Sequence, residues 1–226
     1  SKALKRPGVR AIFTAENTPE IPWRMGMTTI FDSHIRYAGD EIACVIADSD
    51  AICEDALELI EVDYEFVPVV VDPLKAEAED APKLHEAGNI TNGKPDIYER
   101  GDVDQGFTEA DEIVEGTFRT QFQMHNSMET HGCVAAWEGD NLTLYESTQN
   151  IHGVRDMIAM SLGLAKNKVR VIKKYMGGGF GSKNGPGKYT LMAALAAKEL
   201  KRPVKMLLDR REENLLTGNR PATIQN

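Results

Sequence analysis

Met176-Gly-Gly-Gly-Phe-Gly-Ser-Lys183 is the stretch that decides how this sequence is read. Its four glycines give a backbone that can adopt positive φ and present its N–H groups without interfering side chains. The apolar run 169–172 before it predicts a strand, and the alanine-rich pattern 188–200 after it predicts a helix. A strand, a glycine loop and a helix N-terminus in this order favour an anion-binding loop. Phe180 is unusual there, which indicates either that something packs on its ring or that its N–H is directed at one atom.

The loop fits neither of two common nucleotide-binding motifs. A P-loop places its lysine before Ser or Thr, whereas here Ser182 precedes Lys183. The dinucleotide fingerprint GxGxxG, counted from Gly177, fails because Ser182 occupies the place of the third glycine. A structural turn with tight helix packing therefore remains an alternative to a binding loop.

Size and composition indicate a globular protein. The 226 residues are 42% hydrophobic and 27% charged, enough for one large domain or two small ones. No apolar run reaches the roughly 18 residues of a membrane span, and no hydrophobic segment follows the basic residues 1–10, so neither membrane insertion nor a signal peptide is expected. Three cysteines without metal-binding spacing favour a reduced, cytoplasmic setting in which all three are buried or inert: Cys44, Cys53 and Cys133.

The net charge of −9 conceals an asymmetry. Residues 40–115 hold 23 acidic and 4 basic residues, whereas residues 151–226 hold 15 basic and 5 acidic ones. The basic part contains the glycine loop, which suits a phosphorylated or otherwise anionic ligand. Nucleic acid is disfavoured because the basic residues are scattered and are not interleaved with aromatic residues.

Hydrophobic periodicity predicts an α/β (α+β) fold of two bodies. In the first, residues 1–73, strands are predicted at 9–13, 41–47 and 62–66, with a loop at 17–27 and a helix spanning 52–60 after the cap 48–50. The acidic, proline-bearing stretch 74–100 reads as a linker. In the second body, residues 101–226, the predicted elements are helices at 103–110 and 151–164, strands at 113–124 and 204–208, and a hairpin of 132–137 with 141–146.

Gln149 lies in Ser147-Thr-Gln-Asn150, between a predicted strand and a predicted helix. Thr148 or Asn150 can cap that helix. Gln149 carries both donors and acceptors and can point into a pocket at the end of the strand. From the residues alone, plain capping chemistry is the favoured interpretation of this segment.

Glu129 and His131 combine an acid and an imidazole just before a strand. A single histidine is more often a hydrogen-bonded structural residue than a base or a ligand, so catalysis is not the favoured interpretation here. The sequence contains no GxSxG, no HExxH and no paired-cysteine motif.

Together, the glycine loop and Gln149, which precedes Phe180 by 31 positions, resemble the molybdenum hydroxylases, the xanthine dehydrogenase and aldehyde oxidoreductase family. The similarity runs along the whole chain. Segments 39–47 and 62–68 resemble the hammerhead α/β domain of that family. Segments 101–103, 129–131 and 208–210 resemble the first part of its molybdenum-cofactor-binding domain.

The resemblance implies a partial chain of a catalytic subunit, with a partial hammerhead domain followed by the N-terminal part of the molybdopterin-binding domain. The family hydroxylates aldehydes or carbons next to nitrogen, takes oxygen from water and passes electrons to iron–sulfur centres. The implied cofactors are a molybdenum–pterin, in its cytosine dinucleotide form, with [2Fe-2S] and FAD on partner domains or subunits. A small molecule is the implied substrate.

The resemblance also assigns the site. The amide of Gln149 and the backbone N–H of Phe180 are expected to hydrogen-bond the oxo ligand of the metal. The remaining loop residues are expected to let the pterin approach: Gly177, Gly178, Gly179 and Gly181.

Two departures from the family pattern matter. Purine-oxidising members carry a substrate-binding glutamate after the lysine that matches Lys183, and this chain has Asn184, so xanthine is not the expected substrate. The family's catalytic base lies farther along the chain than Asn226, so no catalytic base is assigned and the piece alone is expected to be inactive. The other hypotheses are a non-catalytic glycine-loop domain that binds a phosphorylated, nucleotide-like ligand, and a purely structural α/β domain.

Overall fold

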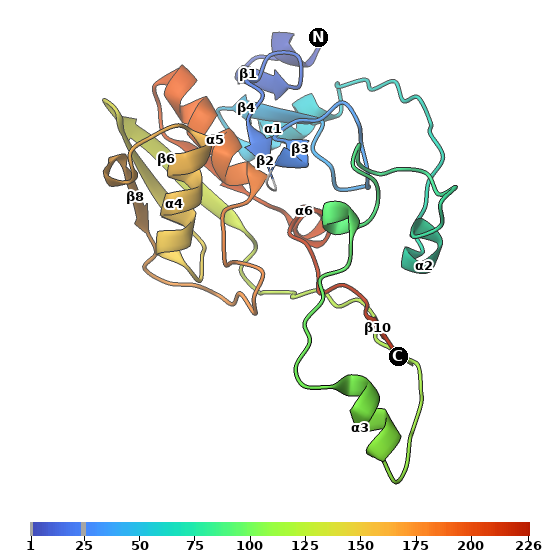
Figure 1. Cartoon of the computed structure of the whole chain (residues 1–226). Helices are drawn as coiled ribbons and strands as arrows, with labels where there is room; N and C mark the ends of the chain where they lie inside the picture. The colour runs from blue at the N-terminus through green and yellow to red at the C-terminus, as the bar shows by residue number, and fades with distance from the viewer. Residues whose placement is uncertain (1, 24–25) are drawn as a thin grey trace. The chain divides into compact units, whose positions relative to one another are not determined.

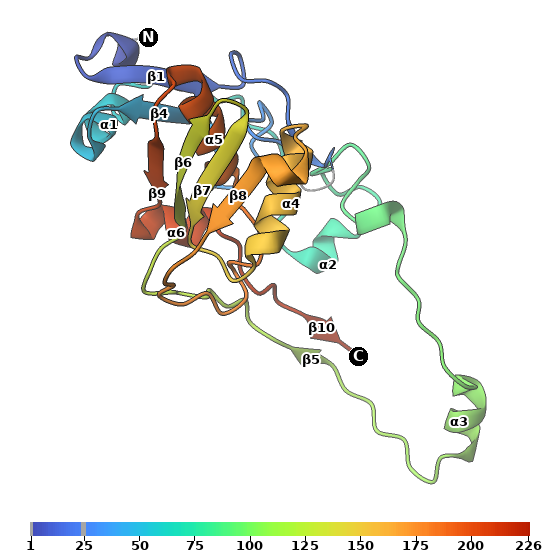
Figure 2. The ribbon, with the colours of Figure 1, turned by 90° about the vertical axis from the view of Figure 1, so that its left-hand side faces the viewer.

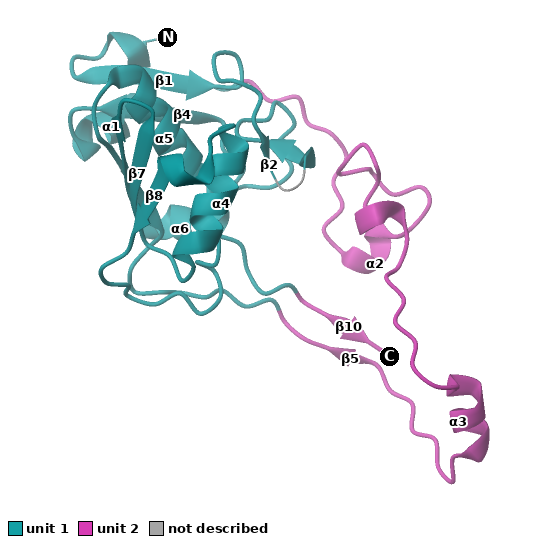
Figure 3. Ribbon diagram, turned by 60° about the vertical axis from the view of Figure 1, so that its left-hand side comes forward, with its two compact units in different colours: residues 1–62, 122–221 teal, residues 63–121, 222–226 magenta. Residues whose placement is uncertain are grey.

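The computed structural model of the chain describes residues 2–23 and 26–226. Its contacts divide the chain into two compact units, Ser1–Val62 with Phe122–Pro221 and Asp63–Gln121 with Ala222–Asn226 (Figure 3). Helices and strands are both present throughout, which confirms the predicted α/β class. The first unit contains the glycine loop and the sheet that supports it.

A four-stranded sheet is the centre of the first unit (Figure 2). The strand order is β8-β7-β6-β9, where β6 is Gly132–Glu138, β7 is Asn141–Glu146, β8 is Val169–Ile172 and β9 is Val204–Leu207. Strands β6 and β7 form the predicted hairpin, closed by the pair Glu138 and Asn141. Strand β9 pairs antiparallel with β6, and β8 pairs parallel with β7.

Two helices pack on this sheet: α4, Ile151–Ser161, and α5, Lys188–Leu200 (Figure 1). Helix α5 has the predicted bounds. Helix α4 ends three residues before the predicted Leu164, because Gly163 leaves the helix at φ +64°. On α4, Val154 and Ile158 are fully buried, whereas Met157 is exposed.

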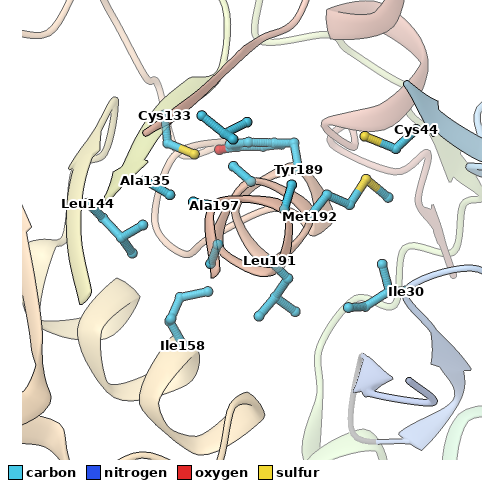
Figure 4. Close-up of a cluster of buried hydrophobic side chains, with 14 of the residues drawn as sticks. Ile30, Cys44, Cys133, Ala135, Leu144, Ile158, Tyr189, Leu191, Met192 and Ala197 are labelled. Atoms are coloured by element: carbon cyan, nitrogen blue, oxygen red, sulfur yellow. The ribbon is translucent and has the colours of Figure 1, made fainter. Parts of the chain in front are cut away.

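The alternation of side chains along β7 directs one face of the strand into the core. Leu142 and Leu144 are fully buried there, while Tyr145 is half exposed. Figure 4 shows Leu144 and Ile158 on one side of α5 and residues of the N-terminal part on the other. The small side chains of α5 let it pack closely on both, and they include Ala193, Ala194, Ala196 and Ala197. Truncating a side chain such as Leu144 to alanine should cost about 2–5 kcal/mol of stability.

The N-terminal part has a two-stranded antiparallel sheet of β1, Val9–Thr14, and β4, Ala43–Ala47, near the strands predicted there. Helix α1, Asp50–Leu57, follows it and is capped by the Ser49 side chain, which accepts from the N–H of Ile52. The helix ends three residues before the predicted end. Within the loop predicted at 17–27, β2, Pro22–Trp23, forms and pairs with β3, Thr28–Thr29, just after the loop. Positions 24–25 lie outside the described residues.

The prediction of a strand at 62–66 is wrong. Within the described chain this segment joins no strand, and Phe66 is 93% exposed. A period-two pattern stabilises a strand only when a neighbouring edge accepts its backbone hydrogen bonds. The predicted β-α-β unit is therefore an antiparallel pair with one helix.

The strand predicted at 113–124 is also mostly wrong. Only β5, Phe118–Arg119, forms, paired with β10, Ile224–Gln225, and an isolated bridge joins Gln123 to Arg220. The helix predicted at 103–110 is confirmed as α3, Val103–Glu109, and its N-terminus is capped by Asp102. A one-turn helix, α2, Pro73–Ala76, lies at the start of the predicted linker.

Helix α6, Arg210–Leu216, was not predicted, although the sequence carries its start signal. Asp209 accepts from the N–H of Glu212, and the Glu212 side chain accepts from the N–H of Asp209, which completes a capping box. This helix follows β9 directly and supplies Glu213 to the interior below the glycine loop.

A buried ion pair joins the N-terminal part to the start of α5. The ammonium of Lys188 lies 2.8 Å from Glu41 and 3.8 Å from Asp40. Burial raises the pKa of Glu41 even against the hydrogen bond and charge of Lys188. Gly39 beside them has no room for a side chain, because an added Cβ would lie 2.7 Å from the Leu215 carbonyl carbon. These contacts fix the N-terminus of α5, which the glycine loop enters.

All three cysteines are free, as predicted. Cys44 and Cys133 are buried, and burial raises the pKa of Cys44 to about 12. No helix of the described residues is long and apolar enough to cross a membrane.

Candidate functional site

The site forms where two connecting segments leave the same edge of the sheet. Because β7 and β8 are parallel, the segment after each strand leaves in the same direction. The first contains Gln149 and leads into α4, and the second is the glycine loop, which leads into α5. The N–H of Gln149 and the hydroxyl of Thr148 both donate to the Lys183 carbonyl, at 2.7 and 2.9 Å. The structure therefore brings together the two predicted site segments.

The ammonium of Lys183 lies inside the protein at the end of the loop, and this residue is 0% exposed. It donates to the Glu129 carbonyl at 2.8 Å and to the Ser147 hydroxyl at 2.7 Å, and its Nζ lies 3.3 Å from the Glu129 carboxylate. A buried charge is tolerated only when it is paired and hydrogen-bonded, as this one is. Lys183 thus ties the end of the loop to the segment before β6.

Glu129 holds the beginning of the loop. Its carboxylate accepts from the N–H of Gly177 at 2.7 Å and from the Ser147 hydroxyl at 2.8 Å, and its own N–H donates to the Gly177 carbonyl at 3.1 Å. Burial alone would raise the pKa of Glu129, but the N–H of Gly177, the Ser147 hydroxyl and the Lys183 ammonium together lower it. The carboxylate is therefore a fixed acceptor between both ends of the loop.

His131 is held below the loop. Its Nδ1 lies 2.9 Å from the Glu213 carboxylate, its backbone N–H donates to the same carboxylate at 2.7 Å, and its Nε2 lies 3.2 Å from the Ser182 carbonyl. Both ring nitrogens thus have partners, which is the arrangement of a structural histidine. Glu213 belongs to the unpredicted α6, so no pattern in the sequence identified this pair.

Gln149 is not the helix cap. The cap of α4 is Asn150, whose side chain accepts from the N–H of Gly153 at 2.9 Å. The Gln149 Oε1 accepts from the N–H of Gly181 at 2.9 Å and, more weakly, from that of Lys183 at 3.4 Å. Since both partners are donors, the oxygen must face the loop, and the NH₂ end of the amide has no acceptor within residues 2–23 and 26–226.

Three consecutive N–H groups of the loop are also uncommitted. Those of Gly178, Gly179 and Phe180 donate to no acceptor in the part of the chain that the structure describes. The loop turns through positive φ at Gly178, at +101°, and at Phe180, at +52°. The Phe180 ring is 61% exposed, so burial of the ring does not explain this residue. Successive N–H groups in such a turn form a concave site for an anionic or oxo group.

The loop has room for a ligand only because its residues are glycines. A Cβ at Gly179 would lie 2.6 Å from Gln149 Cδ, and one at Gly177 would lie 2.7 Å from Glu129 Cβ. Side chains at these positions would displace the two residues that hold the loop. The free N–H groups, the Gln149 amide and the bare backbone together fit a cofactor whose oxygen ligands accept hydrogen bonds.

Asn184 follows the loop and is exposed, with its amide donating to the Gly181 carbonyl at 3.1 Å. Two arginines bind backbone carbonyls nearby, and of these Arg220 was not indicated by the sequence. Arg210 donates to the carbonyls of Ser127 and Met128 at 2.8 and 2.9 Å, and Arg220 donates to the Phe180 carbonyl at 3.0 Å. Both are distant in sequence from their partners. Arg210 lies in the segment 208–210 that resembles the family, whereas no local motif marks Arg220.

Glu146, the last residue of β7, is buried below the Gln149 segment. Its Oε1 accepts from the hydroxyls of Thr190 at 2.9 Å and Tyr189 at 3.1 Å, both on the first turn of α5. Burial raises the pKa of Glu146 to about 8, against the hydrogen bonds from Thr190, Tyr189 and Cys133 that favour the charged form. The carboxyl is therefore largely protonated at neutral pH.

No cluster of three or more His, Cys, Asp or Glu side chains able to hold a metal ion occurs in the described ranges. The site instead offers hydrogen-bond donors to a group that would bring its own ligands. The comparison with known proteins agrees with this chemistry. Residues 84–226 match the family model of the molybdopterin cofactor-binding domain, and residues 1–68 match that of the aldehyde oxidase and xanthine dehydrogenase a/b hammerhead domain.

Curated relatives cover most of this chain. The sequence is 35% identical to a xanthine dehydrogenase molybdenum-binding subunit of Escherichia coli, over 98% of this chain and 31% of that protein. It is 36% identical to the nicotine 6-hydroxylase large subunit of Paenarthrobacter nicotinovorans, over 97% of this chain and 28% of that protein. The chain therefore spans about three tenths of the length of such relatives.

Solved structures resemble the fold over almost the whole chain. A Cu,Mo-CO dehydrogenase superposes with a TM-score of 0.82 at 32% identity, covering 94% of this chain and 30% of that one. The aldehyde oxidoreductase of Desulfovibrio gigas gives a TM-score of 0.80 at 28% identity, covering 98% of this chain and 26% of that one.

Proposed function

This chain belongs to the family of molybdopterin cofactor-binding domains, and on that basis we propose that it is part of the catalytic subunit of a molybdenum hydroxylase. The reaction proposed for the whole protein is oxidation of an aldehyde or an N-heterocycle with oxygen from water. When bound, the molybdenum–pterin supplies the redox chemistry of that reaction. The residues of the protein would bind the cofactor and orient it.

One observation carries the proposal: the loop is held at both ends by Glu129 and Lys183, yet a row of its donors has no partner. The N–H groups of Gly178, Gly179 and Phe180 and the NH₂ of Gln149 have no acceptor in the described chain. Preorganised donors of this kind stabilise oxygen ligands whose charge changes during a reaction. We assign Gln149 and the Phe180 N–H to the oxo ligand of the metal.

The other loop residues have a different part in the proposed site. The N–H groups of Gly177 and Gly181 are already bonded to Glu129 and Gln149, so these two glycines would contribute space for the pterin rather than donors. Asn184 would lie toward the substrate, where its exposed amide replaces the carboxylate of purine-oxidising members. An amide cannot supply the negative charge of that carboxylate, so we propose an aldehyde or another N-heterocycle as the substrate rather than xanthine.

Further parts of the proposal rest on the resemblance. They are a cytosine dinucleotide form of the cofactor, [2Fe-2S] and FAD on partner subunits or domains, a cytoplasmic location and a catalytic base elsewhere in the whole protein. We also propose residues 1–73 as a partial hammerhead domain, 74–100 as a linker and 101–226 as part of the cofactor-binding domain. The names of the relatives describe subunits, which supports an assembly with partners.

The test is Gln149→Ala in the intact molybdenum-containing subunit. Loss of a donor to a group of changing charge should lower kcat per bound molybdenum by roughly 10²–10³. Asn150→Ala is the matched control, since loss of a helix cap should cost about 1 kcal/mol of stability and leave turnover per metal unchanged. If Gln149→Ala changes turnover per metal by less than about a factor of two, the assignment of Gln149 is wrong.

Metal analysis of the same subunit separates this function from its alternative, a module that binds a phosphorylated ligand without redox chemistry. Stoichiometric molybdenum is expected. A bound nucleotide without molybdenum would favour the binding module.

A further inference from the structure

We propose that Arg220 is a positioning residue that holds the peptide between Phe180 and Gly181 and thereby aims the Phe180 N–H at the cofactor. The inference rests on the proposed function, because it assumes that this N–H binds an oxygen ligand. Arg220 lies 40 positions from Phe180 and outside the glycine loop.

The peptide between Phe180 and Gly181 is held from both sides. Its N–H donates to the Gln149 Oε1 at 2.9 Å, and its carbonyl accepts from Arg220 Nη2 at 3.0 Å. Hydrogen bonds that involve a charged partner are stronger than neutral ones. With both of its polar groups bonded, this peptide plane cannot rotate without breaking one of them.

The clamp is needed because Phe180 is strained. A non-glycine residue at φ +52° is in the left-handed region, which is unfavourable for a residue with a side chain and persists only when the surroundings enforce it. The exposed ring of Phe180 contributes little to that enforcement. The turn that contains Phe180 is closed by the N–H and hydroxyl of Ser182, which donate to the Gly179 carbonyl at 2.9 and 2.8 Å. The two bonds to the peptide after Phe180 fix the orientation of that peptide within the turn and so help keep the preceding N–H turned outward.

Arg220 is itself anchored through its backbone. Its N–H donates to the Gln123 carbonyl at 2.8 Å, and its carbonyl accepts from the Gln123 N–H at 3.0 Å. His125 lies two residues after Gln123, and the charge of the Arg220 guanidinium acts on its imidazole. Burial and the charge of Arg220 lower the pKa of His125, so the imidazole is kept neutral beside the arginine. The paired backbone of Gln123 and Arg220 keeps the guanidinium within reach of the Phe180 carbonyl.

The experiment compares Arg220→Met and Arg220→Lys in the intact molybdenum-containing subunit, with Arg211→Met as the control. Arg211 is exposed, and its side chain makes no hydrogen bond or ion pair with any residue that the structure describes. The first readout is amide hydrogen exchange of the Phe180–Gly181 region in enzyme depleted of cofactor. The second is kcat per bound molybdenum, and the third is KM.

In Arg220→Met, exchange at Gly181 should rise at least tenfold and kcat per molybdenum should fall about tenfold, with KM changed less than twofold. Arg220→Lys should restore part of both, because its ammonium is still a cationic donor. Arg211→Met should match the parent. A melting temperature within a few degrees of the parent confirms that each variant folds. If Arg220→Met does not fold, the same readouts in Arg220→Lys decide whether Arg220 holds the peptide.

Unchanged exchange at Gly181 in Arg220→Met would overturn the clamp. Raised exchange with unchanged kcat per molybdenum would overturn the positioning role. Failure of the proposed function looks different: the parent enzyme itself would hold no molybdenum, while the exchange comparison in cofactor-free protein would still decide whether Arg220 holds the peptide.

Discussion

The glycine loop 176–183 and the acidic segment 63–121 are both largely irregular backbone, yet they are held in opposite ways. The loop is fixed at both ends by Glu129 and Lys183 and along its length by Gln149. The acidic segment exposes even its large apolar side chains, such as Phe66 and Val114. Irregular backbone can therefore be rigid when buried side chains satisfy it, and a site built on such backbone can leave selected N–H groups free for a ligand.

The largest expected effect is that of Lys183→Met. It removes a buried charge while leaving the carbonyl of Glu129 and the hydroxyl of Ser147 without their donor, which should cost about 3–5 kcal/mol of unfolding free energy. The matched change in the acidic segment, Lys94→Met, should leave the melting temperature unchanged, because Lys94 is exposed. Equal melting temperatures for the two variants would contradict the view that Lys183 holds the loop.

The dependence of stability on pH extends the comparison to Glu146. This carboxyl group is buried, whereas the carboxylates of 63–121 are exposed. The pKa of Glu146 is about 8 in the folded chain and near the ordinary carboxyl value when unfolded. Its stabilising contribution is thus fully present below about pH 4.3 and is lost as the pH rises to about 8. The expected loss is on the order of 2–4 kcal/mol.

Glu146→Gln cannot ionise, so it should keep its stability across that range. Chemical denaturation of the parent and the variant at several pH values between about 5 and 8.5 measures the difference. The same pH slope in both proteins would show that Glu146 is not the titrating group.

Two glycine-to-alanine changes give the smallest effects and opposite signs. Gly179→Ala should destabilise by about 1–3 kcal/mol, since the new Cβ meets the Gln149 side chain, and it should also reduce molybdenum occupancy of the intact subunit. Gly106→Ala, in α3, has open space around it and should stabilise by up to about 1 kcal/mol. Thermal unfolding measures both. A stabilised Gly179→Ala variant would mean that the loop has more room than the structure shows.

The sequence was sufficient to predict an element where the hydrophobic pattern is clear and the partner that the element packs on is close by in the chain. The hairpin of β6 and β7 follows from alternation around a turn, and α5 follows from its alanine-rich periodicity. The segments 62–66 and 113–124 carry similar patterns but lack a long neighbouring edge among the described residues, so pattern alone overpredicted them.

For the site, the sequence indicated the loop and Gln149 because glycine runs and strand-end residues are local signals. It did not indicate that Lys183 would be fully buried, that Glu213 would bind His131 below the loop, or that Arg220 would reach the Phe180 carbonyl from 40 positions away. Those contacts depend on tertiary packing. The capping box of α6, by contrast, was readable and would have placed Glu213 on a helix.

The central claim, that the loop is bonded on one side and open to a cofactor on the other, is tested most directly by amide hydrogen exchange at single-residue resolution. The intact subunit is measured with its molybdenum cofactor and after the cofactor is removed. The N–H groups of Gly177, Gly181 and Ser182 should exchange slowly in both states, because the protein itself accepts from them. Those of Gly178, Gly179 and Phe180 should exchange rapidly without cofactor and at least tenfold more slowly with it. Equal rates at these three positions in the two states would contradict the claim.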